Sequence, residues 1–213
     1  MMIKRVTIYG DSFADPQWDN VHPTWYGLLK DEGYKVTNLG KSGSGPMYSF
    51  KHLYRNISKY NNDDLLVVII SGAPRLDVEE KDYRLAFEMF KDETIYGNWK
   101  YESLLYALSR QQCKVFAYFL SVEESYFKTS LNDDRYFCFS KGLVDVSWDE
   151  YVEEERLIHE ASDDLNYRIN HLSEVNHEIM YKQVTGFVDG NEIPKFLKNV
   201  YRGTYKKDEF VYD

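Results

Sequence analysis

The sequence predicts an α/β fold in which a parallel sheet is covered by helices on both faces. Short apolar runs alternate along the chain with amphipathic stretches of helical period, which is the pattern of successive strand–helix units. Residues 65–70 are continuously apolar, as is typical of a strand buried on both sides of a parallel sheet. A chain of 213 residues, 43% of them hydrophobic, is long enough to bury a core as one domain.

The expected elements follow in a regular order along the chain. A proline suits the first turn of a helix, so Pro23 favours a helix that begins near that residue. Polar and glycine-rich segments separate the elements, such as the loop of residues 40–45. The expected strands are residues 3–9, 34–39, 65–70 and 113–120, and the expected helices are residues 23–33, 46–60, 97–111 and 173–186.

Residues 121–160 are polar, aromatic and poorly periodic. We interpret them as an insertion or lid, with a short acidic helix at about residues 150–156, inside one domain of residues 1–190. Residues 191–213 carry mixed charge and tyrosines and are interpreted as a C-terminal extension. The sequence contains no internal repeat and no recognisable domain linker.

The composition argues against several classes of partner. The net charge is −9 at pH 7 and no basic stripe is evident, which disfavours nucleic acid and anionic membrane. The sequence shows no signal peptide and no run that approaches the ~20 apolar residues of a membrane span. The expected location is therefore cytoplasmic, with association with a virion left open. Cys113 is expected to be a small buried residue, since a chain of this length needs no disulfide.

The most informative segment is the end of the first strand, residues 10–13 (Gly-Asp-Ser-Phe). Reactive groups of α/β proteins collect at the carboxyl ends of parallel strands, and Ser12 stands there, after a glycine that permits a sharp turn. A serine hydroxyl is a weak nucleophile until a base removes its proton, so the position predicts a base elsewhere in the chain. Asp11 is interpreted as a hydrogen-bonding residue of the turn rather than as an acid.

A glycine-rich loop, residues 38–45 (NLGKSGSG), follows the second strand and is expected at the same edge of the sheet. Gly43 has no side chain to keep a substrate from its N–H group, and the N–H groups of Ser12 and Gly43 are candidates to stabilise an oxyanion. A phosphate-binding P-loop would need glycine where Lys35 stands, and the glycine order does not match a dinucleotide-binding motif. A flexible turn with no chemical role is the alternative.

A candidate base lies near the end of the chain, in residues 170–177 (NHLSEVNH). His171 is expected on the loop before the last helix, from which an imidazole can reach the ends of the strands. Its reference pKa of ~6.5 leaves it neutral enough near pH 7 to accept the proton of Ser12. Taken alone, such a histidine is more often a capping or surface residue. His177 is interpreted as a residue on the face of that helix.

These three segments together resemble the motifs of the SGNH (GDSL-type) hydrolase superfamily. Residues 10–13 are similar to its nucleophile block, residues 38–43 to its glycine block and residues 171–177 to its terminal histidine block. The resemblance covers roughly residues 1–75 and 160–187. It implies a flavodoxin-like, three-layer α/β/α sandwich with a central parallel sheet.

The resemblance also implies an activity and the residues that perform it. Members of the superfamily hydrolyse esters, often acetyl groups on carbohydrates. Carried over by position, Ser12 is the nucleophile and His171 the general base. The N–H groups of Gly43 and Ser12 are the oxyanion donors.

Two positions depart from the family pattern. Where the family has an asparagine as a further oxyanion donor, this chain has Pro74, and Arg75 is the candidate to supply a charged donor or to bind an acidic group of the substrate. A solvated or salt-bridged Arg75 is the alternative. The family places aspartate three residues before the histidine, where this chain has Arg168; Asp164, Asp163 or a backbone carbonyl are the candidates to orient the imidazole. This combination is similar to divergent SGNH-like proteins of phage genomes.

The sequence therefore predicts a serine esterase that needs no metal or other cofactor, with a small-molecule or glycan ester as substrate. O-deacetylation of a carbohydrate is the expected reaction. Trp18, Trp25 and Tyr48 are candidates to line a sugar-binding groove, although core packing is the stronger interpretation for Trp25. The alternative belongs to another class: an SGNH-like module with weak or no catalysis that binds glycans or serves as a structural protein of a virion.

Overall fold

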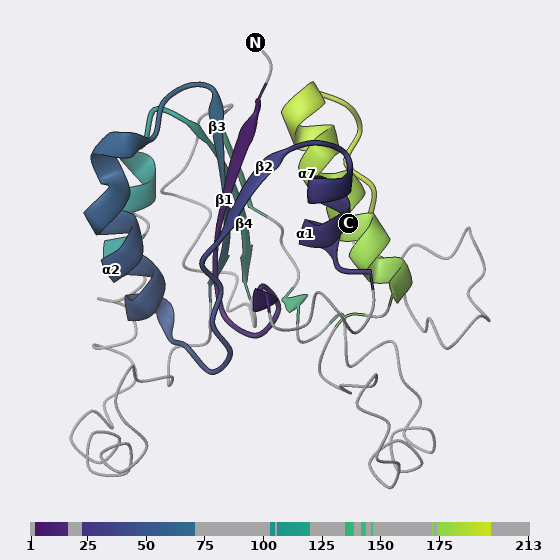
Figure 1. Cartoon of the computed structure of the whole chain (residues 1–213), viewed down its shortest axis with the longest axis horizontal. Coiled ribbons are helices and arrows are strands. Elements are labelled where there is room, and N and C mark those ends of the chain that lie inside the picture. Colours follow the sequence, from purple (N-terminus) through teal and green to yellow (C-terminus); the bar gives the residue numbers. More distant parts are fainter. Residues whose placement is uncertain are drawn as a thin grey trace, which may run out of the picture.

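Five parallel strands form a single sheet in the computed structural model, in the order β2-β1-β3-β4-β5 (Figure 1). All four neighbouring pairs run parallel. This is the strand order of flavodoxin-like, doubly wound folds, so the predicted parallel sheet is confirmed. The strands are β1 (Arg5–Tyr9), β2 (Lys35–Asn38), β3 (Asp64–Ile70), β4 (Lys114–Phe119) and β5 (Tyr136–Cys138).

Helices cover both faces of the sheet and make it the middle of three layers (Figure 1). The helices α1 and α7 lie on one face, and α2 lies on the other with the helical residues 103–104 and 106–109. The predicted α/β/α sandwich is therefore confirmed. The labelled helices are α1 (Trp25–Asp31), α2 (Pro46–Asn56), which continues into the 3-10 helix η2 (Ile57–Lys59), and α7 (Glu174–Asp189). The structure describes residues 3–16, 23–70, 103–104, 106–119, 135–138, 142–143, 146, 172 and 174–196.

The central strand β3 shows why its sequence is apolar without interruption. Every residue of this strand is buried. Alternate side chains enter two different cores, one between the sheet and the α1–α7 layer and one between the sheet and α2. The first core receives Leu65, Val67 and Ile69, and the second receives Leu66, Val68 and Ile70. From Leu65 to Ile70 the strand has helices on both sides and therefore no face left for polar residues, and the polar Asp64 stands only at its first position.

Among the strands in the described residues, β5 is the one that we did not expect from the sequence. It lies inside the region interpreted as an insertion or lid, and it extends the sheet by pairing with residues 115–117 of β4. With three residues it is too short to produce a recognisable alternation of apolar and polar residues. Only residues 135–138, 142–143 and 146 of that region are described, and the expected acidic helix at 150–156 lies outside them.

The start of α1 differs slightly from the expectation. Thr24 caps the helix, with its Oγ1 accepting a hydrogen bond from Gly27 N at 3.1 Å, so Pro23 precedes the helix instead of standing in its first turn. Cys113 is fully buried just before β4, as predicted. Burial raises the pKa of its thiol to about 12, which keeps the sulfur protonated and unreactive near neutral pH.

None of the described helices is long and apolar enough to cross a membrane.

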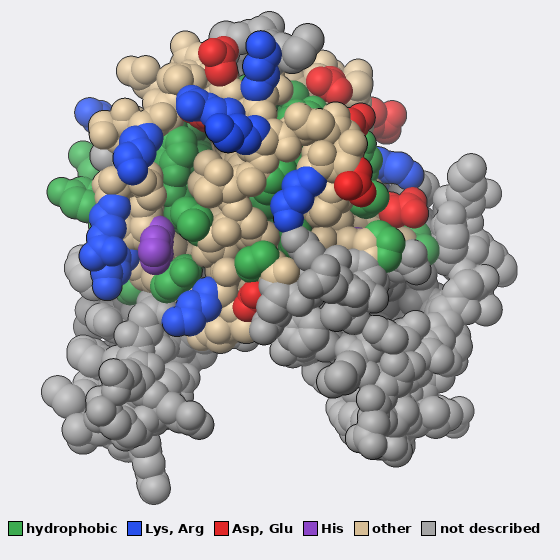
Figure 2. Space-filling view, viewed as in Figure 1, with side chains coloured by type: hydrophobic (Ala, Val, Ile, Leu, Met, Phe, Trp, Pro, Cys, Tyr) green, Lys and Arg blue, Asp and Glu red, His purple; other side chains and the backbone are tan. Residues whose placement is uncertain are grey.

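Charged side chains are unevenly distributed over the surface. Figure 2 shows Lys and Arg side chains (blue) around a histidine (purple) on the side of α2, and most of the Asp and Glu side chains (red) on the side of α1 and α7. In the sequence, residues 33–62 contain five Lys or Arg and no Asp or Glu, although the net charge of the chain is −9. Because α2 occupies the centre of this stretch, its exposed residues form a short basic strip that the sequence analysis overlooked.

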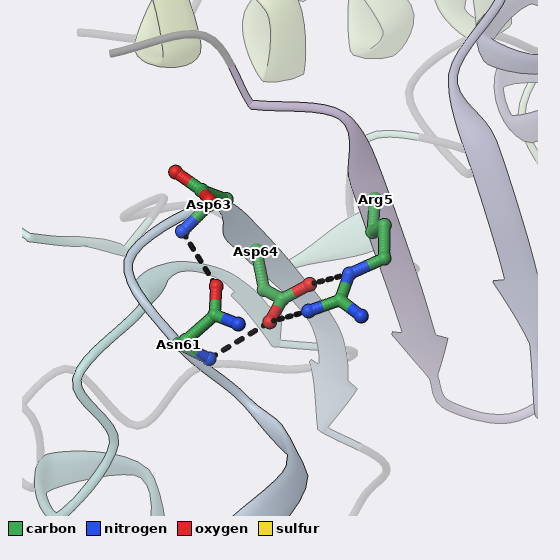
Figure 3. A network of polar contacts seen from close by, with 4 residues as sticks. All are labelled: Arg5, Asn61, Asp63 and Asp64. Carbon is green, nitrogen blue, oxygen red and sulfur yellow. Dashed lines mark hydrogen bonds and ion pairs between the residues drawn. The ribbon is translucent and has the colours of Figure 1, made fainter.

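The amino-terminal ends of β1 and β3 are joined by a charged pair (Figure 3). Arg5 Nε and Nη2 donate to the two carboxylate oxygens of Asp64 at 2.6 and 2.8 Å, and these bonds raise the pKa of Arg5. Asn61 N also donates to Asp64 Oδ2, at 2.8 Å. The Asp64 side chain is only 5% exposed. Since a two-bond contact between guanidinium and carboxylate has one favoured geometry, the pair supports the alignment of Arg5 with Asp64 across the sheet.

We expect Asp64→Ala to lower the free energy of unfolding by about 2 kcal/mol, measured by urea denaturation. The substitution leaves the Asn61 N–H group without its acceptor and the Arg5 guanidinium without its partner. The loss stays moderate because Arg5 is 47% exposed and water replaces part of the contact. The matched control is Asp63→Ala, an exposed neighbour, for which a change within about 0.5 kcal/mol is expected. An equal loss of unfolding free energy in both variants would contradict a specific structural role for the Asp64 carboxylate.

Candidate functional site

The chain turns sharply where β1 ends, and this turn carries Ser12. Asp11 O accepts a hydrogen bond from Ala14 N at 3.0 Å, and Asp11 Oδ1 accepts one from Phe13 N at 3.2 Å. Asp11 is fully buried, so its carboxylate serves the turn and has no exposed atom for a substrate to contact. Ser12 is partly exposed. The turn therefore presents the serine and encloses the neighbouring aspartate.

Gly10 allows this turn to lie directly against β3. A Cβ atom on residue 10 would stand 2.8 Å from the Cβ atom of Ile69 and 3.3 Å from the carbonyl oxygen of Ile69. Any side chain here would push the end of β1 away from the neighbouring strand. The glycine before the serine is therefore required by a close approach of two strands.

The glycine loop is hydrogen-bonded to the end of β1 and to the serine turn. Lys41 N and Ser44 Oγ both donate to the carbonyl oxygen of Gly10, at 3.0 and 3.1 Å. Ser42 N donates to Asp15 Oδ2 at 2.6 Å. Three separate bonds therefore hold the loop in place beside the turn.

At Asn38 and Gly40 the backbone of the glycine loop makes a close approach to the backbone of the serine turn. Asn38 Nδ2 donates to Ala14 O at 2.7 Å, and Asn38 Oδ1 accepts a hydrogen bond from Gly40 N at 2.9 Å. A Cβ atom on Gly40 would lie only 2.5 Å from Ala14 O. The turn of residues 10–15 and the loop of residues 38–44 thus form one unit, which we call the loop clasp.

The loop clasp contains the two N–H groups that the sequence analysis named as oxyanion donors, those of Ser12 and Gly43. Ser44 N donates to Lys41 O at 3.1 Å and Gly43 has φ of 75°, the pattern of a type II turn that favours glycine at this place. Gly43 is exposed, and a Cβ atom there would meet nothing within 4 Å. Within the described part of the chain, neither Ser12 N nor Gly43 N has a hydrogen-bond acceptor. A pair of unused donors beside a serine is what an oxyanion requires.

The helix α1 supports the serine turn from the core. Trp25 Nε1 donates to Phe13 O at 3.0 Å, and the hydroxyl of Tyr26 donates to Asp15 O at 2.7 Å. Both aromatic side chains are buried, and their rings meet edge to face with centroids 5.3 Å apart. Trp25 is therefore a core residue, as the stronger of its two interpretations predicted, and it has no exposed ring to offer a sugar.

His177 belongs to this support rather than to the exposed part of the site. It is buried on α7, and its Nδ1 accepts a hydrogen bond from Trp25 N at 3.4 Å. Trp25 is the first residue of α1, and an N–H group at that place has no partner within the helix. His177 therefore caps α1 and joins it to α7.

The direction of α7 places its first turn at the site. Lys114, at the start of β4, donates through Nζ to the carbonyl oxygens of Phe187 and Val188 near the end of α7, both at 3.0 Å. The helix therefore runs antiparallel to the strands. Its first turn lies at the edge of the sheet where the strands end and where the turn with Ser12 is found (Figure 1).

The structure brings three of the expected site residues into one unit, namely Ser12, Gly43 and the buried Asp11. The other three lie outside the described residues: His171, Asp164 and Arg75. Trp18, Asp163, Pro74 and Arg168 lie outside them as well.

Three positioning residues were missed in the sequence. Asn38 had a visible signal, because an asparagine two residues before a glycine can accept the glycine N–H in an Asx turn. Asp15 and His177 had none, since their bonds join residues that are 27 and 152 positions apart. Among the described residues, no group of three or more His, Cys, Asp or Glu side chains could hold a metal ion.

No protein-family model and no curated protein matches this sequence. Among solved structures, the chain is similar to TesA, with 14% identity and a TM-score of 0.46 over 88% of this chain and 99% of the other. It is also similar to the psychrotrophic esterase EstA from Pseudoalteromonas sp., solved in a form inhibited by monoethylphosphonate, with 13% identity and a TM-score of 0.45 over 88% and 97% of the two chains.

A third similar structure is protein YxiM from Bacillus subtilis. The identity is 12% and the TM-score 0.39, over 61% of this chain. The chain spans 36% of the length of that protein. All three likenesses are distant, and the fold assignment rests on the strands and helices of this chain itself.

We expect Gly40→Ala to destabilise the protein by about 3 kcal/mol or more, measured by urea denaturation. The new methyl group would stand 2.5 Å from the backbone oxygen of Ala14, which cannot rotate away. The matched control is Gly43→Ala in the same loop. Its methyl group has space, so only the left-handed backbone conformation is unfavourable, at about 1–2 kcal/mol. A Gly40→Ala variant no less stable than Gly43→Ala would contradict the close approach.

Proposed function

We propose that the protein hydrolyses carboxylic esters with Ser12 as the nucleophile. The observation that carries the proposal is that Ser12 is partly exposed and that the N–H groups of Ser12 and Gly43, both in the loop clasp, have no acceptor among the described residues. Donors that are already in place stabilise a developing oxyanion without reorganisation, and the loss of one such donor typically costs ~10²–10³ in rate. The loop clasp supplies this rigidity through backbone and side-chain bonds on both sides of the serine.

The proposed reaction has two halves. Ser12 Oγ attacks the acyl carbon while His171 takes its proton, and the resulting oxyanion accepts hydrogen bonds from Ser12 N and Gly43 N. The bond to the alcohol then breaks, and His171 gives the proton to the leaving alcohol. A water molecule attacks the acyl-serine with His171 as base, and the proton returns to Ser12 Oγ as the carboxylic acid is released.

His171 takes the role of base because the other histidine of the same segment is committed elsewhere. His177 is buried, and its Nδ1 binds the first N–H group of α1. His171 stands three residues before the start of α7, whose first turn lies at the edge of the sheet that carries Ser12. We assign Asp164 to orient the imidazole and Arg75 to supply a third, charged donor to the oxyanion.

The proposed substrate is an O-acetylated carbohydrate. Of the aromatic residues considered for a sugar-binding groove, Trp25 is enclosed in the core and Trp18 lies outside the described residues. Tyr48 remains, partly exposed in the first turn of α2, directly after the glycine loop. An aromatic ring with a polar hydroxyl group suits contact with a sugar, which has both apolar C–H surfaces and hydroxyl groups.

The direct test is labelling with a fluorophosphonate probe, which reacts with a serine whose proton is taken by a base. We expect mass spectrometry to find one adduct on Ser12, absent in Ser12→Ala and strongly reduced in His171→Ala. The matched control is Ser58→Ala, an exposed serine on η2, which is expected to label like the wild type. A folded wild-type protein that takes up no probe would contradict the proposal and favour the glycan-binding alternative.

The pH dependence of hydrolysis identifies the base. We expect kcat/KM for p-nitrophenyl acetate to be highest above the pKa of His171, with a reference value of ~6.5, and to fall about tenfold per pH unit below it. The sign follows because a protonated imidazole cannot accept the serine proton. The control is His177→Gln, whose side-chain oxygen still provides an acceptor for the first N–H group of α1, and the profile should persist. If the pH dependence of kcat/KM were lost in His177→Gln, the base would be His177 and not His171.

A further inference from the structure

The basic strip on α2 is a single helical face rather than a set of scattered charges. Tyr48, Lys51, His52 and Arg55 stand at intervals of three and four residues, which places them on the same side of the helix. Lys51 and Arg55 are exposed, and Tyr48 and His52 are partly buried. With a rise of ~1.5 Å per residue, this face extends over roughly 10 Å.

Lys41 connects this face with the loop clasp. Its backbone N–H binds Gly10 O inside the clasp, and its Nζ lies over the ring of Tyr48, 5.6 Å from the centroid. The ring of Tyr48 also contacts that of His52, with centroids 4.5 Å apart. We call these five residues, Lys41 and the four on the helix, the α2 cationic face. It begins two residues before Gly43.

The cations of this face have no neutralising carboxylate in the part of the chain that the structure describes. Burial and the charges of Arg55, Lys51 and Lys41 lower the pKa of His52. Within the described residues, none of the three cations forms an ion pair with a carboxylate. By contrast, Arg5 at the other end of the sheet is paired with Asp64.

We propose that the α2 cationic face binds the acidic groups of a polyanionic carbohydrate whose ester is presented to Ser12, an inference that rests on the proposed function. Two cations on one side of a helix and a third on the loop before it, none paired with a carboxylate among the described residues, suit a polymer with repeated charges better than a single small anion. The polymer must also carry a carboxylic ester within reach of Gly43. A sugar polymer with carboxylate groups and acylated hydroxyl groups meets both conditions, whereas nucleic acid contains no carboxylic ester.

The experiment measures binding without catalysis. De-esterified polygalacturonate serves as the probe, and its Kd is measured by isothermal titration calorimetry for the full chain and for the double variant Lys51→Gln, Arg55→Gln. The matched control is Lys4→Gln, Lys35→Gln, which removes the same charge from exposed residues just before β1 and at the beginning of β2. Neutral dextran and oligothymidylate serve as comparison polymers.

We expect the wild type and the control variant to bind polygalacturonate alike, more weakly as salt increases, and the α2 double variant to bind about tenfold more weakly. Equal binding by the two double variants would overturn the inference. So would no binding by the wild type, or a preference for dextran or oligothymidylate. Fluorophosphonate labelling of Ser12 without polyuronate binding would refute only this inference, whereas binding without labelling would refute only the esterase.

Discussion

The backbones of residues 14 and 40 approach so closely that residue 40 has no room for a side chain, and the geometry of the site depends on this contact. Parallel strands β1 and β2 end at the same edge of the sheet, with Ile8 aligned with Asn38. The backbone segments that follow the two strands must therefore pass one another. Asn38 holds both segments, because its side-chain amide binds Ala14 in one and Gly40 in the other. The loop beyond it can then turn at Gly43 while it stays bonded to the turn that carries Ser12.

The layer of α1 and α7 connects the serine turn at residue 10 with the last described helix of the chain. The core side of the serine turn is held by Trp25 of α1. The first N–H group of α1 is in turn held by His177 of α7. The far end of α7 is fixed to β4 by Lys114. The helix α7 is thus anchored near both ends, which holds its first turn at the edge of the sheet that carries the serine.

Much of the fold could be predicted from the sequence because its determinants are local. The apolar run of β3 and the glycines around Ser12 need only near neighbours to be interpreted. The strand β5 could not be predicted, since three residues in an irregular region carry no period. The bonds of Asp15 and His177 could not be predicted either, because their partners become neighbours only once the layers pack. The α2 cationic face was overlooked because the net charge of −9 conceals a local excess of positive charge.

Charged side chains have different surroundings at the two ends of the sheet. At one end they form a structural ion pair, and at the other they are candidates to bind a ligand. At the amino-terminal end, Arg5 pairs with the almost fully buried carboxylate of Asp64, which accepts three hydrogen bonds in all. These charges therefore hold β1 and β3 together. Next to the loop clasp, three cations share one side of the molecule and find no carboxylate among the described residues. Mutual repulsion among them lowers the stability of the fold slightly. An anionic ligand bound between these cations would remove this repulsion, and this is the energetic advantage that the proposed polyanionic substrate would gain at α2.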